Sequence, residues 1–472
     1  MKKLLLLFIL LGMTDLYHLQ AQEASEKKEP PAFMNDSADE DYKYLRDEET
    51  AEEYEKMFAQ NLKFIGLNAD KTVYLSLGGS YRPRFESTIN ENYTTEDDSY
   101  YSHRLSLHTN LNLGEHFRFF GELFHGFTSG GEERSLEDDE LALHQAFVEL
   151  SIPSKQNEFV FTFGRKQLTY GAGRLLDRRD GPNLRRSLDL VKADYRFNQN
   201  SLEVLFGREV NPEFDVFDND FTLFNGNSAN PSLWGVYADF KVGKILGKTE
   251  LYYLGFHSDF SAFSDLSGEE TRHSLGVRRY GTIGKRMVFN TELVYQFGDL
   301  GDASISAFNF EFDYKYTLIN TGWTPTFGLK FDYSSGDRDR GDNTLQTYSP
   351  IFVNPALYSL AAVNTPVNLN GLHPNFKIYP SEKFSIYMDY AFFFRSSKND
   401  GLYTPPRFQI REATQGSSAY LGSAIGMKIL YEISRNVEFE WRSTYFIPGD
   451  FVKESGESES IFYTGPTLEF KF

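Results

Sequence analysis

The stretch FNFEFDYKY, residues 308–316, decides the fold class of this chain. Five aromatic residues stand at every second position, and Asn, Glu, Asp and Lys stand between them. Successive side chains of a β-strand point to opposite faces, so this period of two gathers the five rings on one face. The pattern predicts that three rings face outward and three polar groups inward, namely Phe308, Phe310 and Phe312 against Asn309, Glu311 and Asp313.

The same alternation continues from Lys71 to the last residue. It is plain in residues 73–85 and 101–113. It returns in residues 287–297, 327–333, 384–394, 427–433 and 437–445. Short turns alternate with longer loops rich in Gly, Asp, Asn and Ser, such as residues 128–137 and 336–343. Short turns at one end and long loops at the other are typical of an up-and-down membrane barrel.

The composition favours a membrane environment for the aromatic face. The chain has 44 Phe and 29 Tyr, and aromatic residues make up 16% of it. Such rings concentrate where a barrel meets lipid and the membrane interface. A soluble β-sandwich or propeller is the alternative, but its apolar face would be aliphatic and its strands shorter. The absence of Cys excludes disulfides and thiolate sites, and a net charge of −19 argues against nucleic-acid binding.

The N-terminal region predicts export and a separate extension. Residues 1–21 have two lysines and then an apolar run too short to span a bilayer, which indicates a cleaved signal peptide rather than an anchor. Residues 22–70 carry 14 acidic and six basic side chains, and residues 47–61 have helix-forming composition. We therefore expect an acidic, partly helical periplasmic extension, and then the barrel over residues 71–472.

The last strand provides a separate indication of a barrel. Leu468, Phe470 and Phe472 share one face, and Glu469 and Lys471 share the other. A terminal amphipathic strand that ends in an aromatic residue resembles the signal read by the barrel assembly machinery. Pairing of the first and last strands also removes the open edges that a bilayer cannot satisfy. The length predicts roughly 16 to 18 strands, which leaves an aqueous lumen.

Positive charge gathers in residues 164–197, GRKQLTYGAGRLLDRRDGPNLRRSLDLVKADYRF. Nine basic side chains stand there against four acidic ones. Glycines and a proline interrupt the alternation, as expected for a loop on or inside the barrel. Guanidinium groups in a constriction attract carboxylates or phosphates. Two interpretations remain open at this point: a net basic passage, or a network in which acids neutralise the arginines and brace the lumen.

This segment is similar to the signature of the bacterial alginate export family of outer-membrane porins, through GRKQLTYG, GRLL, GPN and RRSLD. Compatible stretches follow in order along most of the mature chain, among them residues 62–86, 332–350, 395–403 and 420–453. Leu188 and Leu190 depart from the family pattern, which has Phe and Gly there. The departure predicts that the loop packs differently in this chain.

The resemblance implies an all-β, transmembrane antiparallel barrel of about 18 strands with lumenal loops and both termini in the periplasm. Its arginine-rich, partly acidic lumen would pass an anionic polysaccharide or oligosaccharide. The sequence has no motif for a cofactor or metal. Carried over by position, Arg165, Arg174, Arg186 and Asp189 match the signature, and Arg82 and Arg84 match more weakly. The predicted constriction also includes Arg178, Arg179 and Arg185. The expected partners are outer-membrane lipid, lipopolysaccharide and the assembly machinery that reads Phe472.

Two other functions stay open. A barrel enzyme would need a nucleophile or acid pair with a histidine partner, and the nine histidines form no motif at metal or triad spacing. A general or uptake porin for small anionic solutes would share the fold, because a passive pore has no inherent direction.

Overall fold

The computed structural model describes residues 27–131, 136–224, 230–241, 247–319, 321–361 and 363–472. The predicted signal peptide, residues 1–21, lies outside the described residues. The chain divides into two compact units, Met1–Gln60 and Asn61–Phe472.

The described part of the first unit holds short helical turns. They are η1 (Ser37–Asp39), η2 (Lys43–Leu45) and α2 (Glu48–Glu52); α3 (Gln60–Lys63) follows at the boundary of the units. Asp47 caps α2, because its carboxylate accepts a hydrogen bond from the Thr50 backbone N–H at 2.8 Å. The helix predicted over residues 47–61 is thus limited to one turn at each end of that stretch. Within the described residues, no helix is long and apolar enough to cross a bilayer.

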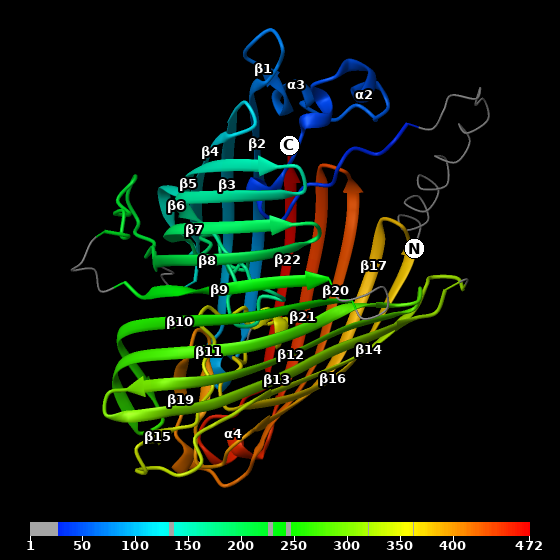
Figure 1. Ribbon diagram of the computed structural model, residues 1–472. Helices are drawn as coiled ribbons and strands as arrows, with labels where there is room; N and C mark the ends of the chain where they lie inside the picture. Colours follow the sequence, from blue (N-terminus) through cyan, green and yellow to red (C-terminus); the bar gives the residue numbers. More distant parts are fainter. Residues whose placement is uncertain (1–26, 132–135, 225–229, 242–246, 320, 362) are drawn as a thin grey trace, which may run out of the picture. The chain divides into compact units, whose positions relative to one another are not determined.

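The second unit is a closed barrel of 18 antiparallel strands (Figure 1). They are β2 (Val73–Ile89), β3 (Asp98–Leu113), β4 (Phe117–Ser129), β5 (Asp139–Ser154), β6 (Asn157–Lys166), β7 (Leu188–Phe197), β8 (Asn200–Glu209), β9 (Ser232–Lys241), β10 (Lys248–Phe263), β11 (Leu266–Ile283), β12 (Met287–Leu300), β13 (Ala303–Thr317), β14 (Thr326–Ser334), β16 (Leu369–Ser381), β17 (Phe384–Arg395), β20 (Tyr420–Ser434), β21 (Val437–Pro448) and β22 (Ile461–Lys471). β22 pairs with β2 and closes the wall. Gly79 and Phe472 exchange two backbone hydrogen bonds at this seam.

Shorter strands add to the wall or lie in its loops. β1 (Ile65–Gly66) pairs with the start of β2, and β15 (Thr344–Leu345) pairs with β13. β18 (Leu402–Thr404) and β19 (Phe408–Arg411) form a separate hairpin in the loop after β17. Further short helices are η3 (Glu91–Tyr93), η4 (Pro355–Leu357), η5 (Ala413–Gln415) and α4 (Asp450–Glu454).

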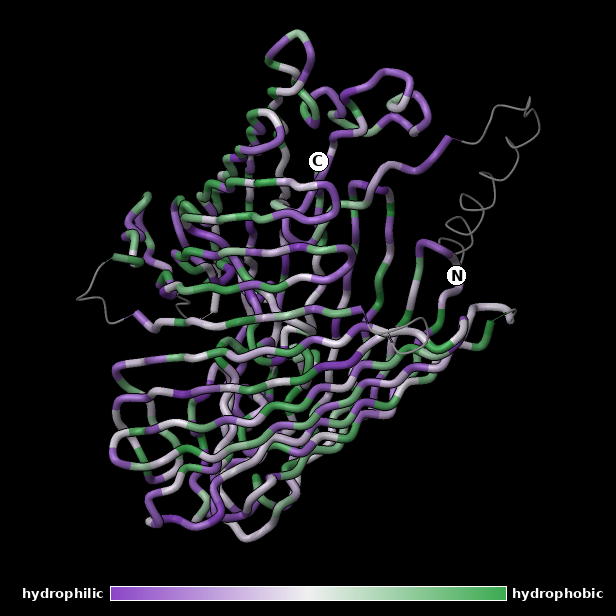
Figure 2. Tube along the Cα trace, viewed as in Figure 1, coloured by the Kyte–Doolittle hydropathy of each residue, from purple (hydrophilic) through white to green (hydrophobic). Residues whose placement is uncertain are grey.

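The side-chain alternation predicted from residues 308–316 is confirmed. Phe308 on β13 is 38% exposed, whereas the next residue, Asn309, is 1% exposed. Asn309 donates to the Ser334 hydroxyl at 3.0 Å, and the buried Glu311 accepts from Tyr358 Oη at 2.7 Å. Figure 2 shows hydrophobic and hydrophilic residues alternating along the strands. The apolar face therefore lies outside and the polar face inside, as a lipid-facing wall requires.

The connections differ at the two ends of the barrel. At one end short turns join the strands, such as residues 155–156 between β5 and β6 and residues 198–199 between β7 and β8. At the other end lie the long loops, with residues 167–187 between β6 and β7 and residues 335–368 between β14 and β16. The predicted basic loop over residues 164–197 is therefore shorter than expected, because its two ends belong to β6 and β7.

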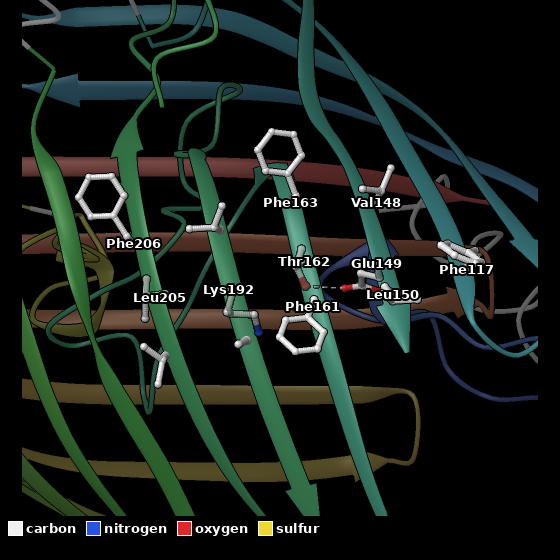
Figure 3. A pocket seen from close by; sticks show the side chains of 13 residues that line it. Phe117, Val148, Glu149, Leu150, Phe161, Thr162, Phe163, Lys192, Leu205 and Phe206 are labelled. Atoms are coloured by element: carbon white, nitrogen blue, oxygen red, sulfur yellow. Dashed lines mark hydrogen bonds between the residues drawn. The ribbon is translucent and has the colours of Figure 1, made fainter. Parts of the chain in front are cut away.

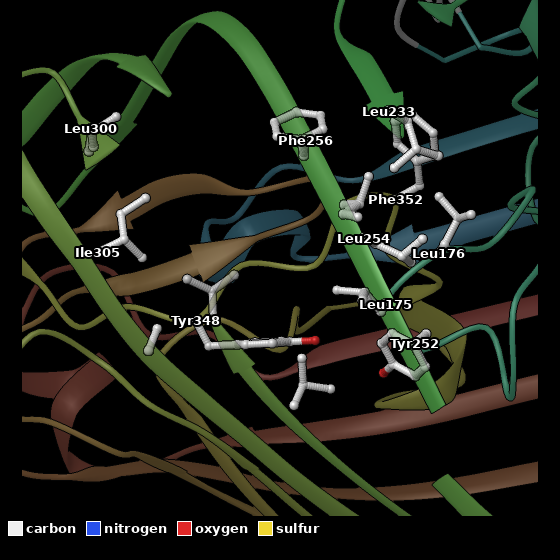
Figure 4. Packing of buried hydrophobic residues seen from close by; sticks show 14 of the residues in the cluster. Leu175, Leu176, Leu233, Tyr252, Leu254, Phe256, Leu300, Ile305, Tyr348 and Phe352 are labelled. Atoms are coloured by element: carbon white, nitrogen blue, oxygen red, sulfur yellow. The ribbon is translucent and has the colours of Figure 1, made fainter. Parts of the chain in front are cut away.

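Apolar packing inside the barrel holds these two loops together. Leu175 and Leu176 of the β6–β7 loop pack with Tyr348 and Phe352 of the β14–β16 loop, against Leu254 on β10 and further wall residues (Figure 4). This packing fixes the loops in the lumen and narrows it, since buried apolar surface stabilises their inward position.

Candidate functional site

The β6–β7 loop crosses the interior and is fastened there by main-chain hydrogen bonds. Ile351 N–H and Phe352 N–H donate to the Leu175 carbonyl at 2.9 and 3.1 Å, and Asp177 N–H donates to the Phe352 carbonyl at 3.1 Å. Leu176 and Phe352 also form a parallel β-bridge. The positions of the arginines that follow Asp177 are therefore set by backbone pairing as well as by apolar packing.

Arginines of the wall and of the β6–β7 loop itself surround Asp180, a residue of this loop. Its carboxylate lies 2.5 Å from Arg185 Nε in the same loop and 3.0 Å from Arg104 Nη1 on β3. Arg82 Nη1 on β2 lies 3.9 Å from the carboxylate and donates to the Asp180 carbonyl at 2.7 Å. Asp180 is 44% exposed, so this group of side chains borders open space in the barrel. We call Arg82, Arg104, Arg185 and Asp180 the Asp180 cluster.

The arginines of the Asp180 cluster keep its carboxylate ionised. Burial alone would raise the pKa of Asp180, but the charges of Arg185, Arg104 and Arg82 outweigh it and hold that pKa well below its usual value. Further carboxylates act on the same arginines: Glu469 lies 3.7 Å from Arg104, and the charges of Glu122 and Glu469 act on Arg185. The cluster therefore places several guanidinium groups and their counter-ions side by side at one point of the lumen.

Arg84, the next inward residue of β2, is neutralised more completely. Its Nη2 lies 3.0 Å from Glu86 and 2.9 Å from Glu137, and its Nη1 donates to the Gly181 carbonyl. Arg84 thus fastens the loop to the wall.

Two predicted site residues lie elsewhere. Arg165 and Asp189 follow the outward-facing side of β6 and β7, where Phe163 and Val191 are exposed. They form a bidentate pair at 2.8 and 3.1 Å that is buried beneath residues 219–222 of the β8–β9 loop. Period-two alternation puts them on the outer face, at the rim of the wall, and not in the lumen where they were expected. Their charges neutralise each other, as in the alternative interpretation, but here the pair braces the rim and not the lumen.

Arg174 is also braced, but inside the barrel. Its guanidinium lies 2.7 Å from Glu311 on β13, and both side chains are almost fully buried. Removal from water is expensive for both charges, so the pair is a structural link between loop and wall.

Arg178, Arg179 and Arg186 keep part of their surface exposed. Arg186 pairs with Glu209 at the end of β8, and its guanidinium lies 4.8 Å from the centre of the Phe352 ring. The charges of Arg179 and Arg407 act on it, so these three arginines are neighbours. Two nitrogens of Arg179, Nε and Nη1, are buried and have no hydrogen-bond partner in the described part of the chain.

Sequence reasoning missed two arginines. Arg104 stands on the polar face of its strand, directly across from Arg82, and this shared parity was the available signal. Arg407 comes from the β17–β20 loop, more than 200 residues from Arg186 in the chain. No local pattern marks it. It donates to Ser349 Oγ at 3.0 Å and lies 3.7 Å from Glu270.

Another part of the wall is acidic and rich in tyrosine. Glu250, Glu292 and Glu311 point inward from β10, β12 and β13. They accept hydrogen bonds from Tyr237, Tyr252 and Tyr358 at 2.6, 2.6 and 2.7 Å. The lumen therefore contains both charge signs, and its arginines gather where the β6–β7 loop meets β2 and β3.

A groove of about 510 Å³ lies on the outside of the wall (Figure 3). Phe161, Phe163 and Phe206 border it from strands β6 and β8, and all three are exposed. Its place on the lipid-facing side separates it from the Asp180 cluster, so it takes no part in passage through the lumen.

Comparisons with known proteins agree with this architecture. The alginate export family model matches residues 73–465. OpdO of Pseudomonas aeruginosa shares 10% identity at a TM-score of 0.54, over 84% of this chain and 97% of that one. OccAB2 of Acinetobacter baumannii and a BenF-like porin from Pseudomonas fluorescens Pf-5 each share 10% identity at a TM-score of 0.55, over 84% of this chain and 98% of theirs. No curated protein sequence matches the chain.

The closed wall and the inward loops define an outer-membrane channel of the porin fold. Because the family model spans nearly the whole barrel, the chain belongs to the alginate export family. Its location is the outer membrane of a Gram-negative bacterium. Family and fold are those of a channel.

Proposed function

We propose that this barrel passes an anionic polysaccharide or oligosaccharide of the alginate kind along the arginines of its lumen. The observation that carries the proposal is the Asp180 cluster, in which three arginines gather around one half-exposed carboxylate. Guanidinium groups bind carboxylates through paired hydrogen bonds, so a uronate that passes Asp180 meets groups already arranged around a carboxylate. Asp180 thus serves as an internal counter-ion beside which the cargo slides.

The partly exposed arginines extend this surface along the β6–β7 loop. Arg178, Arg179 and Arg186 can each meet a passing carboxylate. Opposite unit charges about 4 Å apart attract by about 4 kcal/mol at an effective dielectric near 20, before the cost of desolvation. Several such sites in series bind strongly enough to admit an anion and weakly enough to release it.

The second candidate function is that of a general or uptake porin for small anionic solutes. The packing of the β6–β7 loop on the β14–β16 loop favours it, because this packing narrows the lumen through which a polymer would have to thread. The same arginines would then select single anions instead of a chain.

We place both termini in the periplasm, at the end with the short turns. Porins carry their short turns on that side and their long loops outside. In this orientation the strand that ends at Phe472 is available to the assembly machinery from the periplasm, and the exposed aromatic side chains of the wall contact lipid and lipopolysaccharide.

The charge selectivity of the pore tests the proposal. The reversal potential of the wild type in a planar bilayer under a salt gradient should report an anion preference. The double variant Arg178→Glu with Arg179→Glu should reduce or invert it, because both side chains are partly exposed and form no ion pair within 4 Å in the described residues. Lys285→Glu with Arg286→Glu makes the same charge change in the exposed β11–β12 turn and should leave the preference nearly unchanged. A cation-selective wild type would contradict the proposal.

Blockage of the current separates the two candidates. Oligouronates of increasing length should interrupt the current for increasing times if a chain threads through the lumen. Neutral oligosaccharides of equal length should interrupt it less, because they lack carboxylates. If single uronates alter the current and longer chains do not, the small-solute porin is the correct function.

A further inference from the structure

The β8–β9 loop covers the outer rim of the wall and does so by pairing with β5. β6 pairs with β5 only as far as Ala146, which faces Arg165, and beyond that point the chain leaves the wall for the lumen. The β8–β9 loop takes the vacated place: Glu140 N–H donates to the Phe214 carbonyl at 2.8 Å, and Phe217 N–H donates to the Leu141 carbonyl at 3.0 Å. Leu141 and Val216 form a parallel β-bridge.

This loop is fastened at one point by an ion pair. Arg165 donates to the carbonyls of Asn219 and Asp220 at 3.3 and 2.8 Å while it holds Asp189. The Thr222 backbone N–H donates to Asp189 at 2.6 Å. Charges of both signs are present at this first contact, and each has a partner.

At a second point the loop brings one acidic side chain near another, and no basic side chain of the described residues pairs with either. Asp139, the first residue of β5, is 1% exposed, and neither of its carboxylate oxygens has a hydrogen-bond partner of normal geometry. The backbone N–H of Leu141 favours its charged form, and no basic side chain of the described residues does so. Asp218 of the loop also has a buried oxygen, Oδ1, without a partner; its Oδ2 accepts from the Asp215 N–H at 2.7 Å. The charges that act on Asp139 come from Asp218 and Glu140, which are both acidic.

Two neighbouring buried carboxylates are unfavourable unless a positively charged group binds between them. A buried carboxylate without a partner loses its hydration and gains nothing in return, and a second carboxylate beside it adds repulsion. The free-energy cost is highest for Asp139, because its side chain is buried and cannot reach water. The loop nevertheless pairs with β5 at this point.

We propose that Asp139 and Asp218 bind a divalent cation of the calcium type, which joins the β8–β9 loop to the rim of β5. Calcium takes about six to eight oxygen ligands in a flexible geometry, including carboxylates, backbone carbonyls and water. Two carboxylates with main-chain and water oxygens are therefore sufficient. No group of three or more acidic, histidine or cysteine side chains suited to a metal occurs in the described residues, so main-chain and water oxygens would supply the remaining ligands.

Calcium binding to the folded barrel in detergent tests this proposal directly. After treatment with a chelator, isothermal titration with calcium chloride should give one site per chain. Asp139→Asn and Asp218→Asn should each weaken that affinity at least tenfold. Glu213→Gln removes an exposed acid from the same loop and should leave the affinity unchanged. Absence of a stoichiometric site in the wild type, or its retention in both Asp variants, overturns the proposal.

Proteolysis reports whether the cation fastens the loop. Phe214, Phe217 and Phe224 are exposed and are substrates for chymotrypsin. Calcium should slow cleavage at these residues several-fold in the wild type and in Glu213→Gln, but not in Asp139→Asn. If acidification slows cleavage in the wild type and calcium does not, a shared proton holds the two carboxylates and the cation site is refuted. Channel conductance of each variant, which depends on the intact barrel, shows that the variant is folded.

Discussion

Arg82 on β2 and Arg104 on β3 face each other directly across neighbouring strands, and both guanidinium groups are directed at the β6–β7 loop. Like charges in this position normally destabilise a sheet. Here the carboxylate of Asp180 in that loop lies 3.9 Å from Arg82 and 3.0 Å from Arg104, and it offsets their repulsion. The wall therefore supplies positive charge, and the loop supplies both the counter-ion and further arginines.

Replacing Asp180 by Asn should expose this repulsion. The variant keeps the size of the side chain but removes the charge that Arg82, Arg104 and Arg185 share. We expect a loss of stability of roughly 1–3 kcal/mol, the usual cost of leaving charged donors without their partner, together with a stronger anion preference. Urea unfolding in detergent and reversal potentials in bilayers measure the two effects. A weaker anion preference in the variant would show that Asp180 contributes to passage in some other way than as a counter-ion.

Arg165 and Arg178 should differ sharply in what they contribute to stability. Arg165→Ala leaves Asp189 buried without its partner, which typically costs about 3–5 kcal/mol. Arg178→Ala removes a partly exposed side chain and should cost less than about 1 kcal/mol. Equal losses in unfolding experiments would argue that both arginines brace the protein. The single-channel selectivity should show the reverse order, with the larger change in the Arg178 variant.

Chemical labelling can test the assignment of inner and outer faces. The chain has no Cys, so a single introduced thiol is the only one. Phe308→Cys should react with an apolar maleimide delivered from the lipid phase, and Asn309→Cys should be protected from it. A slip of one residue in the register would exchange the two results. A water-soluble reagent added to the lumen provides the complementary control.

The alternation of side chains predicted the strands of the wall because the two faces of each strand can be read from its own residues. In residues 308–316 the sequence alone separates the lipid face from the lumen, and β13 follows it. Proposed site residues were harder to place, since a cluster of charge in the sequence does not say which way each side chain points. Arg165 and Asp189 belong to the basic segment, yet strand parity turns them outward, where a later loop covers them.

Contacts between loops that are far apart in the chain are the part of the site that the sequence did not predict. Arg407 joins Arg186 only because the β17–β20 loop folds back into the barrel, and Leu176 meets Phe352 only because two inward loops pack together. Neither contact has a local signature, since both depend on how apolar surface is buried between segments far apart in the chain. Arg104 was within reach of sequence analysis, because its parity on β3 matches that of Arg82 on β2.

A pH-dependent contact between two lumenal loops gives the last prediction. Asp337 in the β14–β16 loop is buried, and its backbone N–H donates to the Asp400 carboxylate of the β17–β20 loop at 3.0 Å. Asp400 also accepts from Thr347 Oγ1 and Tyr403 Oη at 2.6 and 2.7 Å. Burial, together with the nearby charges of Asp400, Asp265 and Asp342, raises the pKa of Asp337 to about 6.

The change of stability with pH depends on whether the folded or the unfolded chain binds the Asp337 proton more tightly. The pKa of Asp337 is higher in the folded loops than in the unfolded chain, so the folded state holds more protons between about pH 4 and pH 6. Stability should therefore rise as the pH falls from 7.5 to 5.5, and Asp337→Asn should reduce that rise because its amide carries no charge at either pH. Asp339→Asn, an exposed neighbour in the same loop, should keep the wild-type dependence. Thermal unfolding in detergent at the two pH values measures it, and a wild-type barrel that loses stability on acidification would contradict the assignment of the proton to Asp337.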